Sequence, residues 1–296
     1  MMKSISVLIC TRKKNQNLMK CLNSIKYFAD KFKINLILIE NNFQKTITKY
    51  DFDKLNFNKN INIYYNLEKK IGIPFARNKA LSILKKTNCE FVCFFDDDCE
   101  VSKNWLDSMI KLQKISNVDI ITGPQISKSK KFFIKVLERQ NKHLTQLKWA
   151  ATNNVFAKKK AIINSNITFS QKLKKIGGSD QLFFSCLHKK GKKIIWNENA
   201  IVSEFIDKKR ENFQWFLKRN IRYGASSIII YSELYGFVSA TLICIIKSFF
   251  EFLKFLFYFS TILLNLKLNF FKSIQFLTRS IFTFIGIFGF RFDEYI

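Results

Sequence analysis

Short apolar runs alternate with polar segments along the first third of the chain. Residues 6–10, 34–39, 61–65 and 91–95 are apolar runs with the length of buried strands. Between the first two runs, residues 17–31 carry apolar side chains at helical spacing, at Leu18, Leu22, Ile25 and Phe28. Alternation of strand, helix and strand is typical of a largely parallel sheet covered by helices on both faces. The pattern therefore predicts an α/β fold.

Polar residues follow each predicted strand at its carboxyl end. Thr11 follows the first run, Glu40 the second, and Asp96–Asp98 follow the run at 91–95. Ligand sites of open α/β sheets lie at the carboxyl ends of the strands, so these side chains are expected to converge on one edge. Three adjacent carboxylates repel one another, and hard oxygen ligands favour Mg²⁺ or Mn²⁺, which can hold a diphosphate. A solvated acidic turn is the alternative interpretation.

A second helix is predicted to begin after Gly72. Pro74 suits the first turn of a helix, where its missing N–H is no loss. Arg77 then lies one turn further, near the predicted carboxylate cluster, where a guanidinium can pair with an acid or bind a phosphate. An ordinary Arg–Asp pair that braces the sheet edge is the structural alternative for Arg77.

Six segments occur in an order that resembles the family-2 glycosyltransferases, which use nucleotide-sugar donors and have the GT-A fold. The resemblance extends over roughly residues 5 to 225, and its motifs are residues 6–12, 38–42, 72–80, 95–98, 151–156 and 177–182. It implies a GT-A type nucleotide-binding sheet with helices on both faces. Each motif alone is weak, but their common order is specific.

The resemblance also implies roles for individual residues at the sheet edge. The positions of Thr11 and Glu40 hold the nucleotide base and ribose, and Glu40 is one methylene longer than the usual Asp. The donor-binding set is expected to be Thr11, Arg12, Glu40, Arg77, Asp96 and Asp97. Asp98 would bind a divalent metal, Mg²⁺ or Mn²⁺, directly, with Asp96 as a second contact.

Asp180 is the candidate general base of this resemblance. Inverting glycosyl transfer needs one carboxylate to accept the proton of the attacking hydroxyl. The family commonly has Glu-Asp at this point, whereas this chain has Ser179-Asp180. Because Ser is a good N-cap and an acid in the first turn is favoured by the helix dipole, Asp180 could instead only stabilise a helix start.

Further candidates for the acceptor or the leaving diphosphate lie downstream. They are Asn153, Asn154, Glu204, Arg210, Arg219 and Arg222. Arg219 and Arg222 are three residues apart and so share one helical face, which suits a diphosphate, although a solvated basic face is the alternative. The Gln-x-x-Arg-Trp signature of processive polysaccharide synthases does not occur, which favours transfer of a single sugar.

Charge and cysteine content narrow the range of partners. Lysine and arginine number 50 against 22 acids, a net charge of +28, which favours nucleic acid, anionic lipid or a phosphorylated substrate as partner. The seven cysteines lie mostly in apolar runs and are expected to be reduced core residues.

We predict a glycosyltransferase domain at 1–235, with a donor half at about 1–125 and an acceptor half at 126–235.

The remaining residues, 236–296, are predicted to form a hydrophobic, amphipathic helical tail. Its polar residues recur every three or four positions and form one stripe, at Lys247, Glu251, Lys254, Tyr258, Thr261, Asn265, Asn269 and Lys272. Such a stripe suits a helix that lies in a membrane interface with the stripe toward water, or a hairpin with the stripe against the catalytic domain. A packed helical bundle and an integral segment through 236–290 are the alternatives.

Three classes of function compete for these features. The first is a metal-dependent glycosyltransferase of hexosyltransferase type at the cytoplasmic membrane face, acting on a glycan or lipid-linked acceptor. The second is a sugar nucleotidyltransferase or another phosphoryl enzyme. A nucleotidyltransferase would need a glycine-rich phosphate loop after the first strand, but residues 10–14 contain no glycine. A phosphatase of the haloacid-dehalogenase type would have Thr or Val at the fifth position of its Asp-x-Asp motif, where this chain has Glu100. The third is a non-enzymatic basic binder, which leaves Asp96–Asp98 and Asp180 without a role. The first is favoured, and no nucleic-acid partner is expected.

Overall fold

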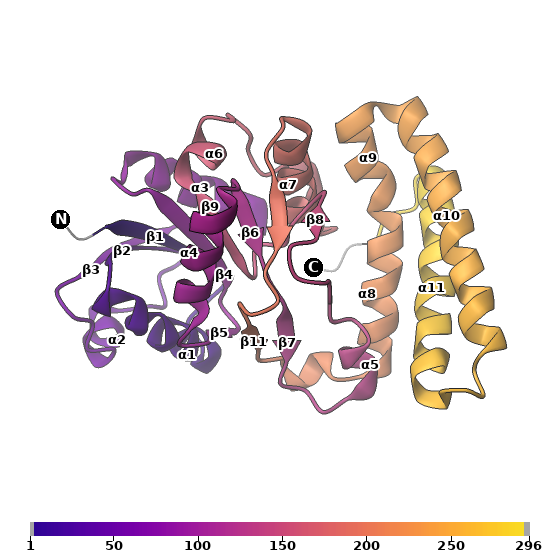
Figure 1. Ribbon diagram of the computed structural model, residues 1–296, viewed down its shortest axis with the longest axis horizontal. Helices are drawn as coiled ribbons and strands as arrows, with labels where there is room; N and C mark the ends of the chain where they lie inside the picture. Colours follow the sequence, from indigo (N-terminus) through magenta and orange to yellow (C-terminus); the bar gives the residue numbers. More distant parts are fainter. Residues whose placement is uncertain (1–2, 293–296) are drawn as a thin grey trace. The chain divides into compact units, whose positions relative to one another are not determined.

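The computed structural model describes residues 3–292, so the predicted tail lies within it except for residues 293–296. The chain divides into two compact units, drawn with their elements in Figure 1. The first unit comprises residues 1–128, 139–171 and 183–205, and the second comprises 129–138, 172–182 and 206–296. Each is described on its own.

The first unit is built on an eight-stranded mixed sheet in the order β3-β2-β1-β4-β9-β6-β10-β8. Its strands are β1 (Ser4–Thr11), β2 (Lys33–Glu40), β3 (Ile61–Leu67), β4 (Phe91–Asp96), β6 (Ile120–Thr122), β8 (Gln146–Leu147), β9 (Val155–Lys158) and β10 (Ile194–Trp196). The four strands that the apolar runs predict are mutually parallel, whereas β9 runs antiparallel to both β4 and β6. A second sheet has the order β5-β11-β7, with β5 (Cys99–Val101), β7 (Gln125–Ser127) and β11 (Val202–Glu204).

Helices cover both faces of the large sheet, which confirms the predicted α/β architecture. They are α1 (Gln16–Ser24), η1 (Ile25–Asp30), α2 (Lys49–Lys54), α3 (Ile73–Lys86), α4 (Trp105–Ser116), α6 (Lys159–Ile163) and the later turns of α7 (Ser179–Lys189). Alternate residues of β1 point to opposite faces. Val7 belongs to a core with Leu22 and Trp105, whereas Leu8 belongs to a separate core with Ala80 and Phe184.

The helix predicted over residues 17–31 is real but changes character at Ser24. It is α-helical to Ser24 and continues as the 3₁₀ helix η1. The Ser24 hydroxyl donates to the Cys21 carbonyl at 2.7 Å and accepts the Val101 N–H at 3.1 Å. Because this side chain bonds to its own backbone and to β5, the helix tightens at this position.

The second unit is helical. Its elements are α5 (Phe132–Lys135), η2 (Gln171–Leu173, whose first residue belongs to the first unit), the first turn of α7, η3 (Lys208–Arg210), α8 (Phe213–Ala225), α9 (Ser227–Tyr235), α10 (Phe237–Ser260) and α11 (Leu266–Ile287). Figure 1 shows α10 and α11 as an antiparallel pair, with the chain turning back between them. No helix among residues 3–292 has both the length and the apolar character required to cross a membrane.

Part of the polar stripe of the predicted tail faces inward, which differs from the arrangement in which the whole stripe meets water. Glu251 and Asn269 are buried. The Lys247 ammonium donates to the Ser227 hydroxyl at 2.7 Å, and Lys272 donates to the Val136 carbonyl at 3.2 Å. Part of the stripe therefore contributes to the interior of this unit, and exposed apolar residues of α10 lie on the opposite face of that helix.

Helices α8 and α11 cross closely at Gly224. A Cβ atom added there would lie 2.9 Å from the Arg279 carbonyl oxygen and 2.9 Å from the Thr283 nitrogen, both backbone atoms of α11. Next to this contact the Arg279 guanidinium donates to the Asn220 side-chain oxygen at 2.8 Å. A glycine is required because backbone atoms on both helices cannot be displaced by side-chain rotation.

We expect Gly224→Ala to lower the free energy of unfolding by about 1–3 kcal/mol, the usual cost of overpacking a closed contact. Denaturant unfolding followed by circular dichroism measures this. The control is Gln214→Ala on the same helix, where the side chain is exposed and stability should not change. Equal stability of Gly224→Ala and the parent would show that α8 and α11 are not in close contact.

Candidate active site

The parallel register of the first unit brings the predicted strand-end residues to one edge. Thr11 is opposite Glu40 in the β1–β2 pair, and Cys10 is opposite Asp96 in the β1–β4 pair. Thr11, Glu40 and Asp96 are thus successive strand ends on the same side of the sheet, as predicted. Asp97 and Asp98 form the turn that connects β4 to β5.

The three carboxylates of this turn have different surroundings. The Thr11 hydroxyl donates to Asp97 at 2.5 Å. The Arg77 guanidinium lies 3.4 Å from an oxygen of Asp96, and the Thr152 hydroxyl donates to that same oxygen at 3.4 Å. The backbone carbonyl of Asp98 accepts the Phe205 N–H at 2.8 Å, which ties the turn to the end of β11. The side chains of all three are partly exposed, so the cluster remains open to a ligand.

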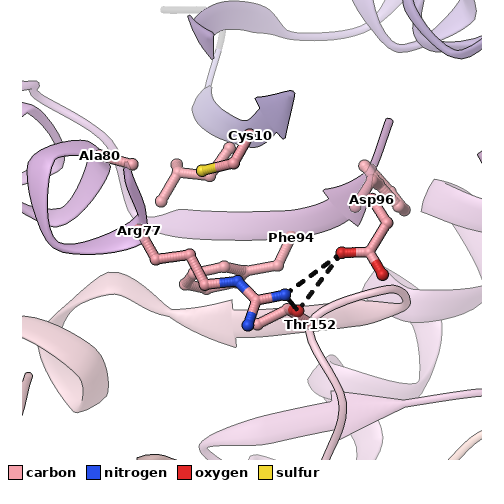
Figure 2. A pocket seen from close by; sticks show the side chains of 8 residues that line it. Cys10, Arg77, Ala80, Phe94, Asp96 and Thr152 are labelled. Atoms are coloured by element: carbon pink, nitrogen blue, oxygen red, sulfur yellow. Dashed lines mark hydrogen bonds and ion pairs between the residues drawn. The ribbon is translucent and has the colours of Figure 1, made fainter. Parts of the chain in front are cut away.

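Arg77 reaches the cluster from α3, and Figure 2 shows its guanidinium directed at Asp96 and Thr152. Its other face covers the Phe169 ring at 5.4 Å, a cation–π contact that fixes the side chain. Beside it is a small cavity lined by Cys10, Phe94 and Thr152 among others. Burial is the main reason that the pKa of Cys10 is raised to about 12, so this thiol is neutral at physiological pH.

Asn41, which the sequence reasoning did not select, positions the start of α3. Its side-chain amide donates to the carbonyls of Glu68 and Lys70, at 3.0 and 2.7 Å, and its oxygen accepts the Gly72 N–H at 2.8 Å. Gly72 has φ of 136°, a value that favours glycine. The end of β2 therefore holds the loop that begins α3, and with it Arg77. The position of Asn41 after a strand end was the available signal.

Thr152 was also missed as a site residue, although it lies in one of the motifs. Its position follows from the antiparallel pairing of β9 with β4, in which Phe94 is opposite Val155. Residues just before Val155 consequently lie beside residues just after Phe94, which places Thr152 next to Asp96. An alternation of strands and helices predicts parallel pairing, so it did not indicate this neighbour.

Glu40 is buried, and its carboxylate is used within the fold. It accepts the Thr46 N–H at 3.0 Å, the Thr46 hydroxyl at 2.7 Å and the Tyr65 hydroxyl. Burial alone would raise the pKa of Glu40, but the hydrogen bonds from Thr46 and Tyr65 outweigh it, and the pKa is lowered below its ordinary 4.5. Glu40 thus organises the loop after β2, and its contact with a nucleotide stays a prediction.

The remaining first-unit candidates differ in exposure. Arg12 is exposed, and Glu204 is partly exposed at the end of β11. Asn153 donates to the Gln125 side chain. Asn154 is fully buried, accepts the Trp105 indole N–H at 2.8 Å and donates to the carbonyls of Pro124 and Ala200. Since these bonds use its amide inside the fold, Asn154 has a structural role rather than the expected contact with an acceptor.

Asp180 and the three downstream arginines belong to the second unit. Asp180 lies in the first turn of α7, is partly exposed, and accepts the Gln181 N–H at 2.8 Å. Arg222 lies on α8 beside Gly177, where an added Cβ would be 3.4 Å from the guanidinium. Arg219 covers the Trp215 ring at 5.1 Å, and Arg210 lies in η3. The expected helical spacing of Arg219 and Arg222 is thus present.

Family and structural comparisons agree with this arrangement. The sequence profile of Glycosyl transferase family 2 matches residues 6–175. The chain belongs to this family. A curated relative, the succinoglycan biosynthesis protein ExoM of Rhizobium meliloti (strain 1021), is 27% identical over 160 residues, which are 52% of this chain and 51% of ExoM. The chain therefore matches about half the length of ExoM.

Solved structures share the fold of this family-2 chain at low sequence identity. Residues 1–349 of S. aureus TarS superpose with a TM-score of 0.57 and 14% identity, over 94% of this chain and 89% of that one. GalNAc-T7, solved with UDP, GalNAc and Mn²⁺, has a TM-score of 0.53 and 14% identity, over 76% of this chain and 50% of that one. The predicted GT-A type fold is confirmed by these similarities.

The lowered pKa of Glu40 makes a prediction about acid stability. A lowered folded pKa contributes stability above the ordinary carboxyl range, and this is lost as pH falls through the folded pKa. We expect Glu40→Gln to lose about 1–3 kcal/mol of unfolding free energy at neutral pH, and its difference from the parent to shrink in acid.

Thermal and denaturant unfolding of Glu40→Gln and the parent, from neutral pH into acid, measure this difference in unfolding free energy. The control is Glu90→Gln, since Glu90 forms an exposed ion pair with Lys3 that should contribute little. A Glu40→Gln protein as stable as the parent at neutral pH would contradict the assigned role.

Proposed function

We propose that this family-2 glycosyltransferase transfers a single sugar from a nucleotide-diphosphate sugar to a hydroxyl of a glycan or lipid-linked acceptor, with inversion. The observation that carries the proposal is the Asp96–Asp98 turn at the carboxyl edge of the parallel strands, flanked by Thr11 and Arg77. GT-A sites bind their donors at this edge, and the structure of GalNAc-T7 contains a nucleotide, a sugar and a divalent metal.

The donor set proposed is Thr11, Arg12, Glu40, Arg77, Asp96 and Asp97. Arg77 has two roles in this scheme. It balances Asp96 when no ligand is bound, and its fixed guanidinium can donate to a phosphate oxygen of the donor. Charge is the reason for the pairing, because a diphosphate approaching three carboxylates meets repulsion that cationic groups must offset.

A divalent cation, Mg²⁺ or Mn²⁺, would offset the rest of that repulsion. No group of three or more His, Cys, Asp or Glu side chains with metal-binding geometry occurs in residues 3–292. The carboxylates present still fit, because Mg²⁺ usually takes one or two protein carboxylates together with substrate phosphates and water. Asp98, with Asp96, would hold the ion, which when bound stabilises the negative charge of the leaving diphosphate.

For the transfer step, we propose Asp180 as the general base. Its carboxylate would take the proton of the acceptor hydroxyl as that oxygen attacks the anomeric carbon and the bond to the diphosphate breaks. Its partial exposure and its position in the first turn of α7, after two glycines of positive φ, support this assignment. Arg210, Arg219 and Arg222 are proposed for the diphosphate or the acceptor, together with Asn153 and Glu204.

The proposed place of action is the cytoplasmic face of a membrane. The similarity to ExoM, a succinoglycan biosynthesis protein, supports a cell-surface glycan as the acceptor class. We further propose that residues 1–235 carry catalysis, with donor and acceptor halves divided near residue 125, and that residues 236–296 associate with the membrane. The basic charge of the chain suits an anionic surface.

Asp98→Asn should remove the effect of the metal on donor binding without unfolding the protein. Calorimetric titration of a nucleoside diphosphate with and without Mn²⁺ is the test, and we expect the affinity in Mn²⁺ to fall by about 10-fold or more. Asp53→Asn, an exposed acid on α2, is the matched control. Unchanged affinity of Asp98→Asn at the same Mn²⁺ concentration would refute the assignment of this metal ligand.

Asp180→Asn should separate binding from transfer. We expect donor affinity to be kept and turnover to fall by about 10²–10⁴-fold, the usual contribution of a general base. Turnover is measured as release of nucleoside diphosphate with a panel of sugar nucleotides and acceptors, and Glu233→Gln on α9 serves as the control. Near-parental turnover in Asp180→Asn would mean that Asp180 only stabilises the start of α7 through the helix dipole.

A further inference from the structure

Helices α10 and α11 form a hairpin whose interior is polar. The Ser248 hydroxyl donates to the Ser280 carbonyl at 2.9 Å, and the Ser280 hydroxyl donates to the Ser248 carbonyl at 2.8 Å. Thr283 is completely buried, and Glu251 is 8% exposed. These groups would be solvated if the helices separated in water, so they do not by themselves favour the pairing in water.

The outer face of α10 has the opposite character. Leu242, Ile246, Phe249, Leu253 and Phe257 lie at helical spacing on one face and are each between 41% and 61% exposed. The turn that follows α10 adds Leu263 and Leu264, which are 89% and 84% exposed. We call this set of residues the α10 apolar face. A water-facing helix pair would have apolar residues inside and polar residues outside.

Polar groups inside and apolar groups outside is the arrangement that a hydrocarbon solvent favours. Charge supports the same occupant. Of the charged residues between positions 237 and 292 only Glu251 is acidic, and it is buried, whereas the exposed ones are Lys254, Lys267 and Arg291. The hairpin thus presents exposed Phe and Leu side chains accompanied only by exposed cations, which complements acyl chains beneath anionic headgroups.

We propose that the α10 apolar face inserts into the acyl boundary of an anionic phospholipid bilayer, with Lys267 at the headgroups, whereas Lys254 pairs with Glu251 at 3.5 Å. This deepens the membrane location of the proposed function and rests on it, but it assigns the contact to one face of one hairpin. It also differs from the predicted arrangement in which the whole polar stripe meets water, because Glu251 and Asn269 of that stripe are buried. The lysine stems can extend along the apolar surface to keep their ammonium groups in water.

The test uses the full chain and vesicles of equal parts phosphatidylglycerol and phosphatidylcholine. In co-sedimentation we expect the triple variant Ile246→Ser, Phe249→Ser, Leu253→Ser to bind at least about tenfold more weakly than the parent. The control is Phe43→Ser with Ile115→Ser, two side chains that are 67% and 75% exposed in the first unit and should not matter. Parent binding to phosphatidylcholine alone should be weaker.

A second readout reports insertion directly. Phe249→Trp should be quenched by bromine atoms on the acyl chains, whereas Ile115→Trp should not. Equal vesicle affinity of parent and triple variant, or no quenching of Phe249→Trp, would overturn the proposal. A third outcome would also overturn the proposal. If the parent does not bind vesicles but forms a dimer without lipid in sedimentation velocity, and the triple variant is a monomer, the face binds a second copy of the chain.

Circular dichroism checks that the triple variant is folded, which is expected because its three side chains are on the surface. Donor turnover separates the two levels of the proposal. A parent that turns over a sugar nucleotide but ignores vesicles would leave the glycosyltransferase function standing and reject the membrane face. Vesicle binding without turnover of any donor would support the membrane face and reject the proposed glycosyl transfer.

Discussion

Three adjacent carboxylates at the end of β4 create a repulsion that the surrounding fold has to offset. Each is treated differently: Thr11 donates to Asp97, Arg77 and Thr152 lie against Asp96, and Asp98 is tied by its backbone to Phe205. These partners come from separate segments of the chain. The site thus depends on an electrostatic constraint that only the assembled sheet can satisfy, and the partial exposure of the acids leaves part of the charge for a ligand.

Backbone register positions these partners. Parallel pairing sets Thr11, Glu40 and Asp96 as neighbours, and the Asn41 amide carries that order into the next helix by holding the loop that ends at Gly72. The Asn41 amide and Gly72 therefore position the start of α3, whereas Phe169 and Asp96 contact the Arg77 side chain itself. A substitution at Asn41 would act on the site through α3 and not through direct contact with a ligand.

The site could be predicted from the sequence where it depends only on the parallel pairing of neighbouring strands. Strand ends converge in any parallel sheet, so the edge and its acids were predictable from apolar runs. Thr152 was not, because its place depends on the antiparallel strand β9, which no local pattern distinguishes from a parallel one. Asn154 is of a residue type that often binds ligands, but its burial beside Trp105 depends on the tertiary fold and could not be predicted from local sequence. Periodicity predicted the stripe on the tail but left open whether it meets water or protein, because periodicity identifies a face and not its neighbour, and Glu251 and Asn269 of that stripe are buried.

The two units apply one rule to different interiors. In the first, buried polar side chains such as Glu40 and Asn154 are bonded within a core that is otherwise apolar. In the second, Ser248 and Ser280 exchange hydrogen bonds between α10 and α11, while Phe and Leu side chains of α10 point outward. A polar group is costly wherever it is buried without a partner, so both interiors have to bond the polar side chains that they enclose. The difference lies on the outside, because α10 exposes Phe and Leu side chains where a helix pair that faces water would expose polar ones, and our proposal of a membrane contact starts from that reversal.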